Sequence, residues 1–514
     1  MGFGDEKLKT TPSQVAIGLV PVGFLVVVFF LPISLLINEV VQIGFSSSNQ
    51  LSVLLESTVA ISLTAGFQAV GSVVLTLLIG IPLAGLLSIY KFSGQRFLQA
   101  LVLVPFVLPT LVTGLAFRGL FDELLSPGLL LLWLSHVYVN LAVVVRIVGG
   151  AWGALDQRYE SIAASLNKTP VQVFRLITLP LLKPAIARAA ALVFVFTFSS
   201  LGLVLLLGGS QQTLESQLLR QISLLLDFPA AAVTATFQFL ISILVLAIAN
   251  RFNSAKSDLG SREKTALPRA MTRVPIVYVV LLLLPLLSLF GLSVRTNTGI
   301  SLQNWVSVLQ DEATLDAVFA SIRIASITGL LSVTIGLFVA LAARSRGLQK
   351  LPLLFALPIS VSSVTVGLAL LLSSRSIENL LIPNFLLASI AHSLVALPFV
   401  TAVLVPAITN IDSRWYTAAA ALGANSWRGQ KVVLAPILDR AVPLALTLAI
   451  AISLGEFGAA SFLAEANQPT LAVLLLRLAT RPAAEALGMA AVLAVLLGLI
   501  SLGLSMMWQS QESK

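Results

Sequence analysis

The sequence has 514 residues, of which 57% are hydrophobic and only 10% are charged, and its mean hydropathy is +0.99. Soluble domains carry roughly 25% charged residues, so this composition excludes a water-soluble globular protein and predicts a membrane protein. The absence of cysteine excludes disulfide scaffolds and thiolate metal sites, and two histidines argue against an imidazole metal cluster. The net charge of +9 does not indicate a nucleic-acid partner, because the basic residues lie between apolar runs rather than on one solvated face.

Apolar stretches long enough to cross a bilayer as helices of about 20 residues occur twelve times along the chain. The predicted fold class is therefore an all-α membrane protein with about 12 transmembrane helices. The spans are expected at residues 15–37, 58–90, 98–117, 127–149, 189–207, 229–250, 274–294, 317–343, 351–373, 384–408, 441–463 and 486–508.

Basic residues are distributed unevenly between the loops that these spans define. With a cytoplasmic N-terminus, the inner loops hold 23 of the 31 Lys and Arg residues against nine acidic residues. The outer loops hold six basic and twelve acidic residues, a net charge of −6. An excess of Lys and Arg marks the cytoplasmic side. We therefore predict that both termini are cytoplasmic.

The chain contains two copies of one six-helix unit, because matching residues recur at an offset close to half its length. The predicted organisation is a first repeat at residues 1–250, a basic cytoplasmic linker at 251–273 and a second repeat at 274–514. An even number of spans in each half makes both copies run in the same direction, as in transporters whose passage lies between two halves. Three pairs share the offset of 256: His136 and His392, Asp156 and Asp412, and Pro180 and Pro436.

A polar segment with a repeated pattern lies between the fourth and fifth spans of each half, at residues 156–180 and 412–436. Each copy predicts an Ala-rich helix, a break suited to a helix C-terminus, a second short helix opened by a capping residue, and a closing proline. The break and the proline are 13 residues apart in both copies. These residues are Asn167 and Pro180 in the first copy and Gly423 and Pro436 in the second.

This pattern resembles the EAA loop in permease subunits of binding-protein-dependent ABC importers, where Glu-Ala-Ala is followed by a Gly and, thirteen residues later, by the proline of a Leu-Pro pair. The resemblance covers essentially the whole chain, because each half supplies the spans and the loop in the same order. The sequence departs from the pattern at Ile162, Asn167 and Ala435, and at the Glu position in both copies. The resemblance assigns ATPase coupling to Ser161, Ala163, Ala164, Asn167, Pro180, Thr417, Ala418, Ala419, Gly423 and Pro436.

The resemblance implies the type I ABC importer permease fold, with two ATPase subunits bound at the cytoplasmic face and a solute-binding protein outside. Each ATPase would receive one coupling helix, and ATP-driven closure would switch the passage between outward and inward access. The chain has no Gly-x-x-x-x-Gly-Lys-Ser/Thr phosphate loop, so ATP is expected on the partner subunits and no cofactor on this chain. We expect a transport subunit of a bacterial cytoplasmic membrane, in contact with lipid and without enzymatic activity. The alternative for the polar segments is a pair of interfacial amphipathic helices.

A carboxylate inside a predicted span is energetically costly, which singles out Glu456 as a functional residue. It belongs to the stretch 454–458, whose repeat mate is 198–202, and both are expected in the fifth span, which lines the passage in the family. The alternative is that Glu456 pairs with Arg323 or another partner and holds helices together. For the two histidines we expect hydrogen bonds to neighbouring helices rather than a role in transport. The candidate translocation path consists of Ser199, Ser200, Gly202, Glu456 and Gly458.

Fusion of both halves at this length resembles the thiamine and ferric-iron importers. The stretch 198–215 is most similar to thiamine permeases, whereas 453–458 and 468–471 are shared more widely with iron and oxyanion importers. Negative outer loops favour either a cationic solute or the docking of a binding protein. We expect thiamine as the solute, with ferric iron or another small ion as the alternative. An ion-coupled secondary transporter is the competing class, but it requires ionisable residues near the midplane, and Glu456 is almost the only one.

Overall fold

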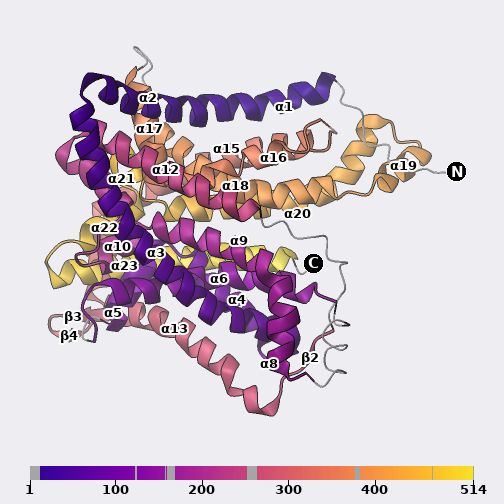
Figure 1. The fold of residues 1–514 in the computed structure, drawn as a ribbon, viewed down its shortest axis with the longest axis horizontal. Coiled ribbons are helices and arrows are strands. Elements are labelled where there is room, and N and C mark those ends of the chain that lie inside the picture. The colour runs from indigo at the N-terminus through magenta and orange to yellow at the C-terminus, as the bar shows by residue number, and fades with distance from the viewer. Residues whose placement is uncertain are drawn as a thin grey trace.

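The computed structural model describes residues 12–121, 124–156, 158, 168–251, 263–345, 347–376, 382–465 and 467–512. Within these ranges the chain is a bundle of long helices (Figure 1). Ten helices are long and apolar enough to cross a membrane, and two bent helix pairs raise the number to as many as 12. The predicted all-α class with about 12 membrane helices is therefore confirmed.

The described helices up to residue 251 form five continuous spans and one bent pair. In chain order they are α1 (Pro12–Leu25), η1 (Val26–Phe30) and α2 (Leu31–Ser46) as one span, α3 (Ser48–Ile89), the pair α4 (Gln95–Val107) and α5 (Thr110–Phe121), α6 (Leu129–Gly153), then α8 (Pro170–Val173), η2 (Phe174–Thr178) and α9 (Leu179–Phe198) as one span, the short helices α10 (Gly202–Leu207), α11 (Leu214–Arg220) and η3 (Gln221–Leu225), and α12 (Phe228–Asn250).

The described helices after residue 263 follow the same order, with five spans and one bent pair. They are η4 (Arg269–Met271) and α13 (Arg273–Val294), the short α14 (Gln303–Gln310), α15 (Glu312–Ala342), the pair formed by α16 (Leu351–Leu354) and η5 (Leu357–Ser360) with α17 (Ser363–Ser376), α18 (Asn384–Thr409), the short α19 (Ser413–Ala421), α20 (Ser426–Gly455), the short α21 (Ala460–Leu463) and α22 (Leu471–Ala479), and α23 (Ala484–Glu512).

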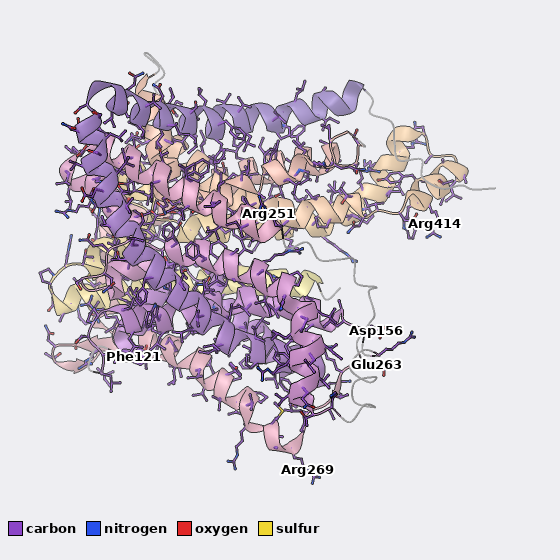
Figure 2. All side chains as sticks on the ribbon, viewed as in Figure 1. Phe121, Asp156, Arg251, Glu263, Arg269 and Arg414 are labelled. Carbon is purple, nitrogen blue, oxygen red and sulfur yellow. The ribbon has the colours of Figure 1, made fainter. Side chains whose placement is uncertain are left out.

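The third span of each half is broken, so the single helices expected at 98–117 and 351–373 are wrong. The two parts of the pair bend by 106° in the first half and by 100° in the second. In the first half, Leu108 takes an extended backbone and Pro109 cannot donate to a helix ladder, which ends α4. The first pair still crosses the bundle, because Phe121 at its end lies opposite Asp156 and Arg251 (Figure 2).

The fifth spans are displaced from the expected 189–207 and 441–463. The helices end earlier, at Phe198 and Gly455, and they begin earlier, at residues 170 and 426. Pro180 and Pro436 were expected to close a short helix, but both lie inside these long helices. Helices in a membrane tolerate proline where neighbouring groups satisfy the freed carbonyls. Glu456 consequently follows the fifth span instead of lying within it.

The first span of each half packs on the other half. The helices α1 and α2 contact α15 and α17, while α13 contacts α4 and α5. One continuous core therefore contains buried side chains from both halves. Within each half, the second and fourth spans approach closely at a glycine: a Cβ on Gly80 would lie 2.8 Å from Val144, and one on Gly336 would lie 2.7 Å from Val400.

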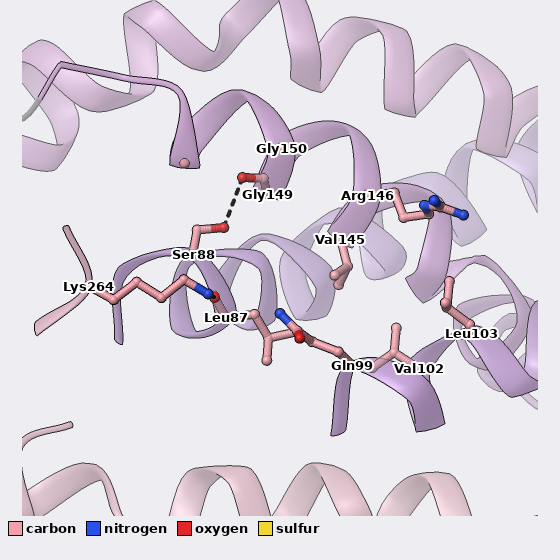
Figure 3. A pocket seen from close by; sticks show the side chains of 11 residues that line it. Leu87, Ser88, Gln99, Val102, Leu103, Val145, Arg146, Gly149, Gly150 and Lys264 are labelled. Atoms are coloured by element: carbon pink, nitrogen blue, oxygen red, sulfur yellow. Dashed lines mark hydrogen bonds between the residues drawn. The ribbon is translucent and has the colours of Figure 1, made fainter. Parts of the chain in front are cut away.

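The described part of the linker is joined to the bundle by a short strand pair, in which β1 (Tyr90–Lys91) pairs in parallel with β2 (Thr265–Ala266). A second pair, β3 (Arg295–Thr296) with β4 (Gly299–Ile300), lies after α13 and does not involve the linker. Beside β2, Lys264 Nζ donates to the carbonyl of Leu87 at 2.8 Å. Lys264 and Arg146 line a cavity of about 390 Å³ between α3, α4 and α6 (Figure 3). Arg146 thus lines a cavity at a helix interface, as intramembrane charges usually do.

Candidate translocation site and coupling segments

The candidate path lies where backbone breaks from the two halves meet. A Cβ on Gly202 would lie 2.5 Å from Thr110 Oγ1 and 3.2 Å from the Phe457 ring. A Cβ on Gly455 would lie 3.0 Å from Pro109. Phe457 and Gly455 belong to the second half, whereas Gly202, Thr110 and Pro109 belong to the first. This junction therefore lies between the halves. The breaks that form it are residues 199–201 after α9, 456–459 after α20, 108–109 between α4 and α5, and 361–362 before α17.

The two glycines named from the sequence occupy equivalent places at this junction. Gly202 lies against Thr110, the first residue of α5, and Gly458 lies against Ser363, the first residue of α17. Only a residue without a Cβ fits this close approach. Non-helical backbone at membrane depth is tolerated where it is buried in protein or lines a water-filled cavity. The junction is therefore buried non-helical backbone contributed by both halves, which is what a candidate path between them requires.

Glu456 is held by its own turn. The Gly458 N–H donates to Glu456 Oε1 at 2.7 Å, and the Ser363 side chain is hydrogen-bonded to the same carboxylate. The alternative partner, Arg323, instead donates from Nη2 to Gln468 Oε1 at 3.3 Å and lies 4.2 Å from the centre of the Phe385 ring. Arg323 is therefore not the partner of Glu456, but the alternative of another partner on a neighbouring helix fits Ser363 of α17.

Ser199 and Ser200 lie beside a carboxylate that the sequence did not single out. Gln238 Nε2 donates to Ser199 Oγ at 3.0 Å and to Glu215 Oε1 at 3.3 Å. Hydropathy assigned Glu215 to an outer loop, whereas the structure buries it on α11 to 1% exposure. Its helix α11 contacts α17, whose first residue, Ser363, is hydrogen-bonded to Glu456. The capping box formed by Thr213, just before Glu215, was the sequence signal of a helix at this point.

The second coupling segment is a helix and a turn at one end of the molecule (Figure 1). Asp412 caps α19 by accepting the Arg414 N–H at 2.9 Å, and hydrogen bonds from Arg414 lower the pKa of this carboxyl. Gly423 has a φ of +83° in the turn, and Asn425 caps α20 by accepting the Arg428 N–H at 2.8 Å. The break and the cap thus lie where the sequence predicts them, but the second helix continues into the fifth span.

The surface of α19 is unusually apolar for an exposed helix. Trp415 is 67% exposed and Leu422 at its end is 90% exposed. Thr417 and Ala418 are exposed as well, and Ala419 is partly buried. An apolar group on a projecting helix is typical of a protein-binding surface. Four residues assigned to coupling in the first copy lie outside the described residues: Ser161, Ala163, Ala164 and Asn167.

Residues 76–257, which run from the last third of the second span to the end of the sixth, match the family described as binding-protein-dependent transport system inner membrane component. The chain has a permease domain of the ABC importer type. It is a multi-pass membrane protein and a transport subunit, not an enzyme, and its fold is that of type I importer permeases.

Relatives of the permease extend the similarity beyond the matched half. The thiamine transport system permease protein ThiP of Haemophilus influenzae is 26% identical over 428 residues, which cover 76% of this chain and 78% of the relative. ThiP of Escherichia coli is 28% identical and covers the same shares. The sulfate transport system permease protein CysT of Salmonella typhimurium is 28% identical over 255 residues, 46% of this chain but 91% of the relative. Two fused halves account for this difference in coverage.

Both histidines of the permease are buried and hydrogen-bonded to a neighbouring helix, as expected. His136 Nδ1 on α6 lies 2.7 Å from Gln68 Nε2 on α3 and 3.1 Å from Ser72 Oγ. His392 Nδ1 on α18 lies 2.9 Å from Ser453 Oγ on α20. The two residues correspond in the repeat, but they join different helix pairs.

Replacing His392 by alanine is expected to destabilise the permease by about 3 kcal/mol, because the change leaves a cavity and removes a buried hydrogen bond. Uptake per inserted molecule should stay within about twofold of wild type. Thermal unfolding in detergent measures the first effect and vesicle uptake the second. Since His392→Asn keeps a polar atom near Ser453, it should lose less stability. Loss of uptake with unchanged stability would contradict the packing role.

Proposed function

We propose that the permease is the membrane subunit of an ATP-driven importer that passes thiamine from an external binding protein into the cytoplasm. The observation that carries this proposal is the similarity to thiamine permeases across most of the chain, up to 84% of it for ThiP of Brucella abortus. The relative named for sulfate transport is similar over only 46% of the chain. Ferric iron remains the alternative from the sequence; among the described residues, no group of three His, Cys, Asp or Glu is arranged to hold a metal ion.

Two separate ATPase subunits would bind at the end of the molecule that carries α19 and bring the ATP, with no cofactor on this chain. In this arrangement both termini are cytoplasmic, residues 1–250 and 274–514 form the two repeats, and 251–273 is the linker between them. The exposed Trp415 and Leu422 support docking at α19. The basic residues Arg158, Arg414 and Arg428 are exposed on the two segments, which fits the cytoplasmic side.

The coupling residues assigned by resemblance divide by location. Thr417, Ala418, Ala419 and Gly423 belong to α19 and its turn, where a partner can reach them. Pro180 and Pro436 lie inside the fifth spans, far from the ends of these helices at Phe198 and Gly455, where the junction lies. We propose that the first group contacts the ATPase and that the helices carrying the prolines transmit its movement. The long continuous α20 supports this, because it runs from the turn directly to the break before Glu456.

Vesicles that contain the permease, its ATPase and its binding protein are expected to accumulate labelled thiamine only when ATP is present inside. Vanadate should abolish the uptake, because it traps the ATPase subunits. If the same vesicles took up labelled ferric iron and no thiamine, iron would replace thiamine as the proposed cargo. Uptake that is driven by a proton gradient and insensitive to vanadate would overturn the importer mechanism in favour of a secondary transporter.

A further inference from the structure

The buried polar side chains around Glu215 offer more hydrogen-bond acceptors than donors. Gln238 Nε2 donates to both Ser199 Oγ and Glu215 Oε1, which fixes the orientation of its amide. The Gln238 carbonyl oxygen then has no hydrogen-bond partner in the described chain, and neither has Glu215 Oε2. Both side chains are 1% exposed. Buried acceptors of this kind normally have a donor, and apart from the side chains of Gln238 and Ser362 the described residues supply none to this group.

A basic side chain does not supply the missing donor. Within the part of the chain that the structure describes, the recorded ion pairs join Asp156 to Arg158 and Asp412 to Arg414, at the coupling segments. Another acid, Glu456, is linked to the helix of Glu215 through α17. Two ionised carboxylates at membrane depth are costly unless they take up protons or a cation accompanies them.

The two carboxylates belong to different halves and are linked through one break. The Ser362 side chain interacts with Glu215, and the next residue, Ser363, interacts with Glu456. These serines open α17 of the second half, whereas Glu215 lies on α11 of the first. Glu456 is only partly buried, so it is the more accessible member of the pair.

Aromatic rings approach the same interface. Phe106 on α4, one turn before the Pro109 break, lies with its ring centre 6.5 Å from that of Phe399 on α18 and 6.0 Å from that of Phe196 on α9. Phe457 adjoins Gly202 across the junction. Aromatic faces attract cations and stack on flat ring systems. Aromatic rings from both halves thus lie at the interface that also contains the junction, as a passage for an organic cation would require.

We propose that Glu215 and Glu456 form a cation-binding station in the passage, which holds the positively charged group of the solute between the halves. Gln238 and Ser199 position the Glu215 carboxylate, and the free Gln238 carbonyl accepts a donor from the solute. This inference deepens the proposed function and rests on it, because the thiazolium ring of thiamine carries a permanent positive charge.

Glu215→Gln keeps the size and removes the charge, so vesicles with this variant should take up thiamine at least about tenfold more slowly. ATP hydrolysis stimulated by the loaded binding protein should persist, because the coupling segments are unchanged. Glu485→Gln, which removes an exposed acid at the start of α23, is the matched control and should transport normally. Normal uptake by Glu215→Gln overturns the station and leaves the proposed cargo standing.

Labelling by dicyclohexylcarbodiimide, which modifies carboxyl groups in apolar surroundings, tests the station without transport. In the purified complete transporter, saturating thiamine or tetramethylammonium should slow modification of Glu215, measured by mass spectrometry, at least about fivefold. Glucose, which is neutral, should have no effect. Equal labelling with and without both cations overturns the station. If wild-type vesicles take up no thiamine but tetramethylammonium protects Glu215, the proposed cargo fails and the station stands.

Discussion

Gly423→Val is expected to reduce ATP-dependent uptake by at least about tenfold. The turn after α19 is a Schellman motif, in which the Ala424 N–H donates to the Ala419 carbonyl at 3.0 Å and the Gly423 N–H to that of Ala420 at 2.9 Å. This motif requires the left-handed backbone that Gly423 adopts, with φ +83°. A β-branched residue there costs about 1–2 kcal/mol or more, enough to misdirect α19 in most molecules.

Gly423→Asn is the matched control, because asparagine is the side-chain-bearing residue that most readily adopts this backbone. The first segment has asparagine at the corresponding position, Asn167. This variant should retain at least half of the uptake. Uptake and ATP hydrolysis stimulated by the binding protein are measured in vesicles with equal amounts of permease. Normal transport by Gly423→Val would remove the coupling assignment from the second segment.

Gly336→Leu is expected to destabilise the permease by about 3 kcal/mol and to reduce the yield of folded protein several-fold. A Cβ at this position would lie 2.7 Å from Val400 Cγ1 and 3.0 Å from Leu404 Cδ1, so a leucine must push α15 away from α18. Association of helices in lipid depends on such close packing at small residues, since no hydrophobic effect replaces it there.

Gly66→Leu provides the control, because it lies on α3, the counterpart of α15, and a Cβ there meets nothing within 4 Å. Its thermal stability in detergent and its elution as a single species should equal those of wild type. Equal stability of Gly336→Leu would show that α15 and α18 separate freely, which contradicts their close packing in the structure.

The number and order of the spans were predictable, because each is an apolar run that must satisfy its backbone inside the bilayer. Their ends were not. Hydropathy averages over a window, so it continued the fifth span through Gly202 and omitted its polar start at Ser426. It also missed the sharp bends at Pro109 and Ser362, because a bent pair has the same composition as a straight helix.

Among the candidate path residues, Glu456, Gly202 and Gly458 stood out because a charge or a glycine in an apolar stretch needs a local reason. The neighbours of these residues were not predictable. Glu215 was assigned to an outer loop because it lies between two apolar runs, and Arg323 was assigned to Glu456 by charge alone. Contacts between residues more than a hundred positions apart depend on how helices pack, and hydropathy contains no such information.

The sequence by itself determined that this is a membrane protein of two similar halves, each with a polar segment of the same spacing, since composition, offset and spacing are properties of the chain alone. Tertiary structure decided that four backbone breaks meet between the halves, and that Glu215 and Glu456 are linked through α17 without a basic partner in the described residues. The reason is physical: the bilayer acts on each segment through its own hydropathy, whereas the charge balance of a buried site depends on which distant segments fold around it.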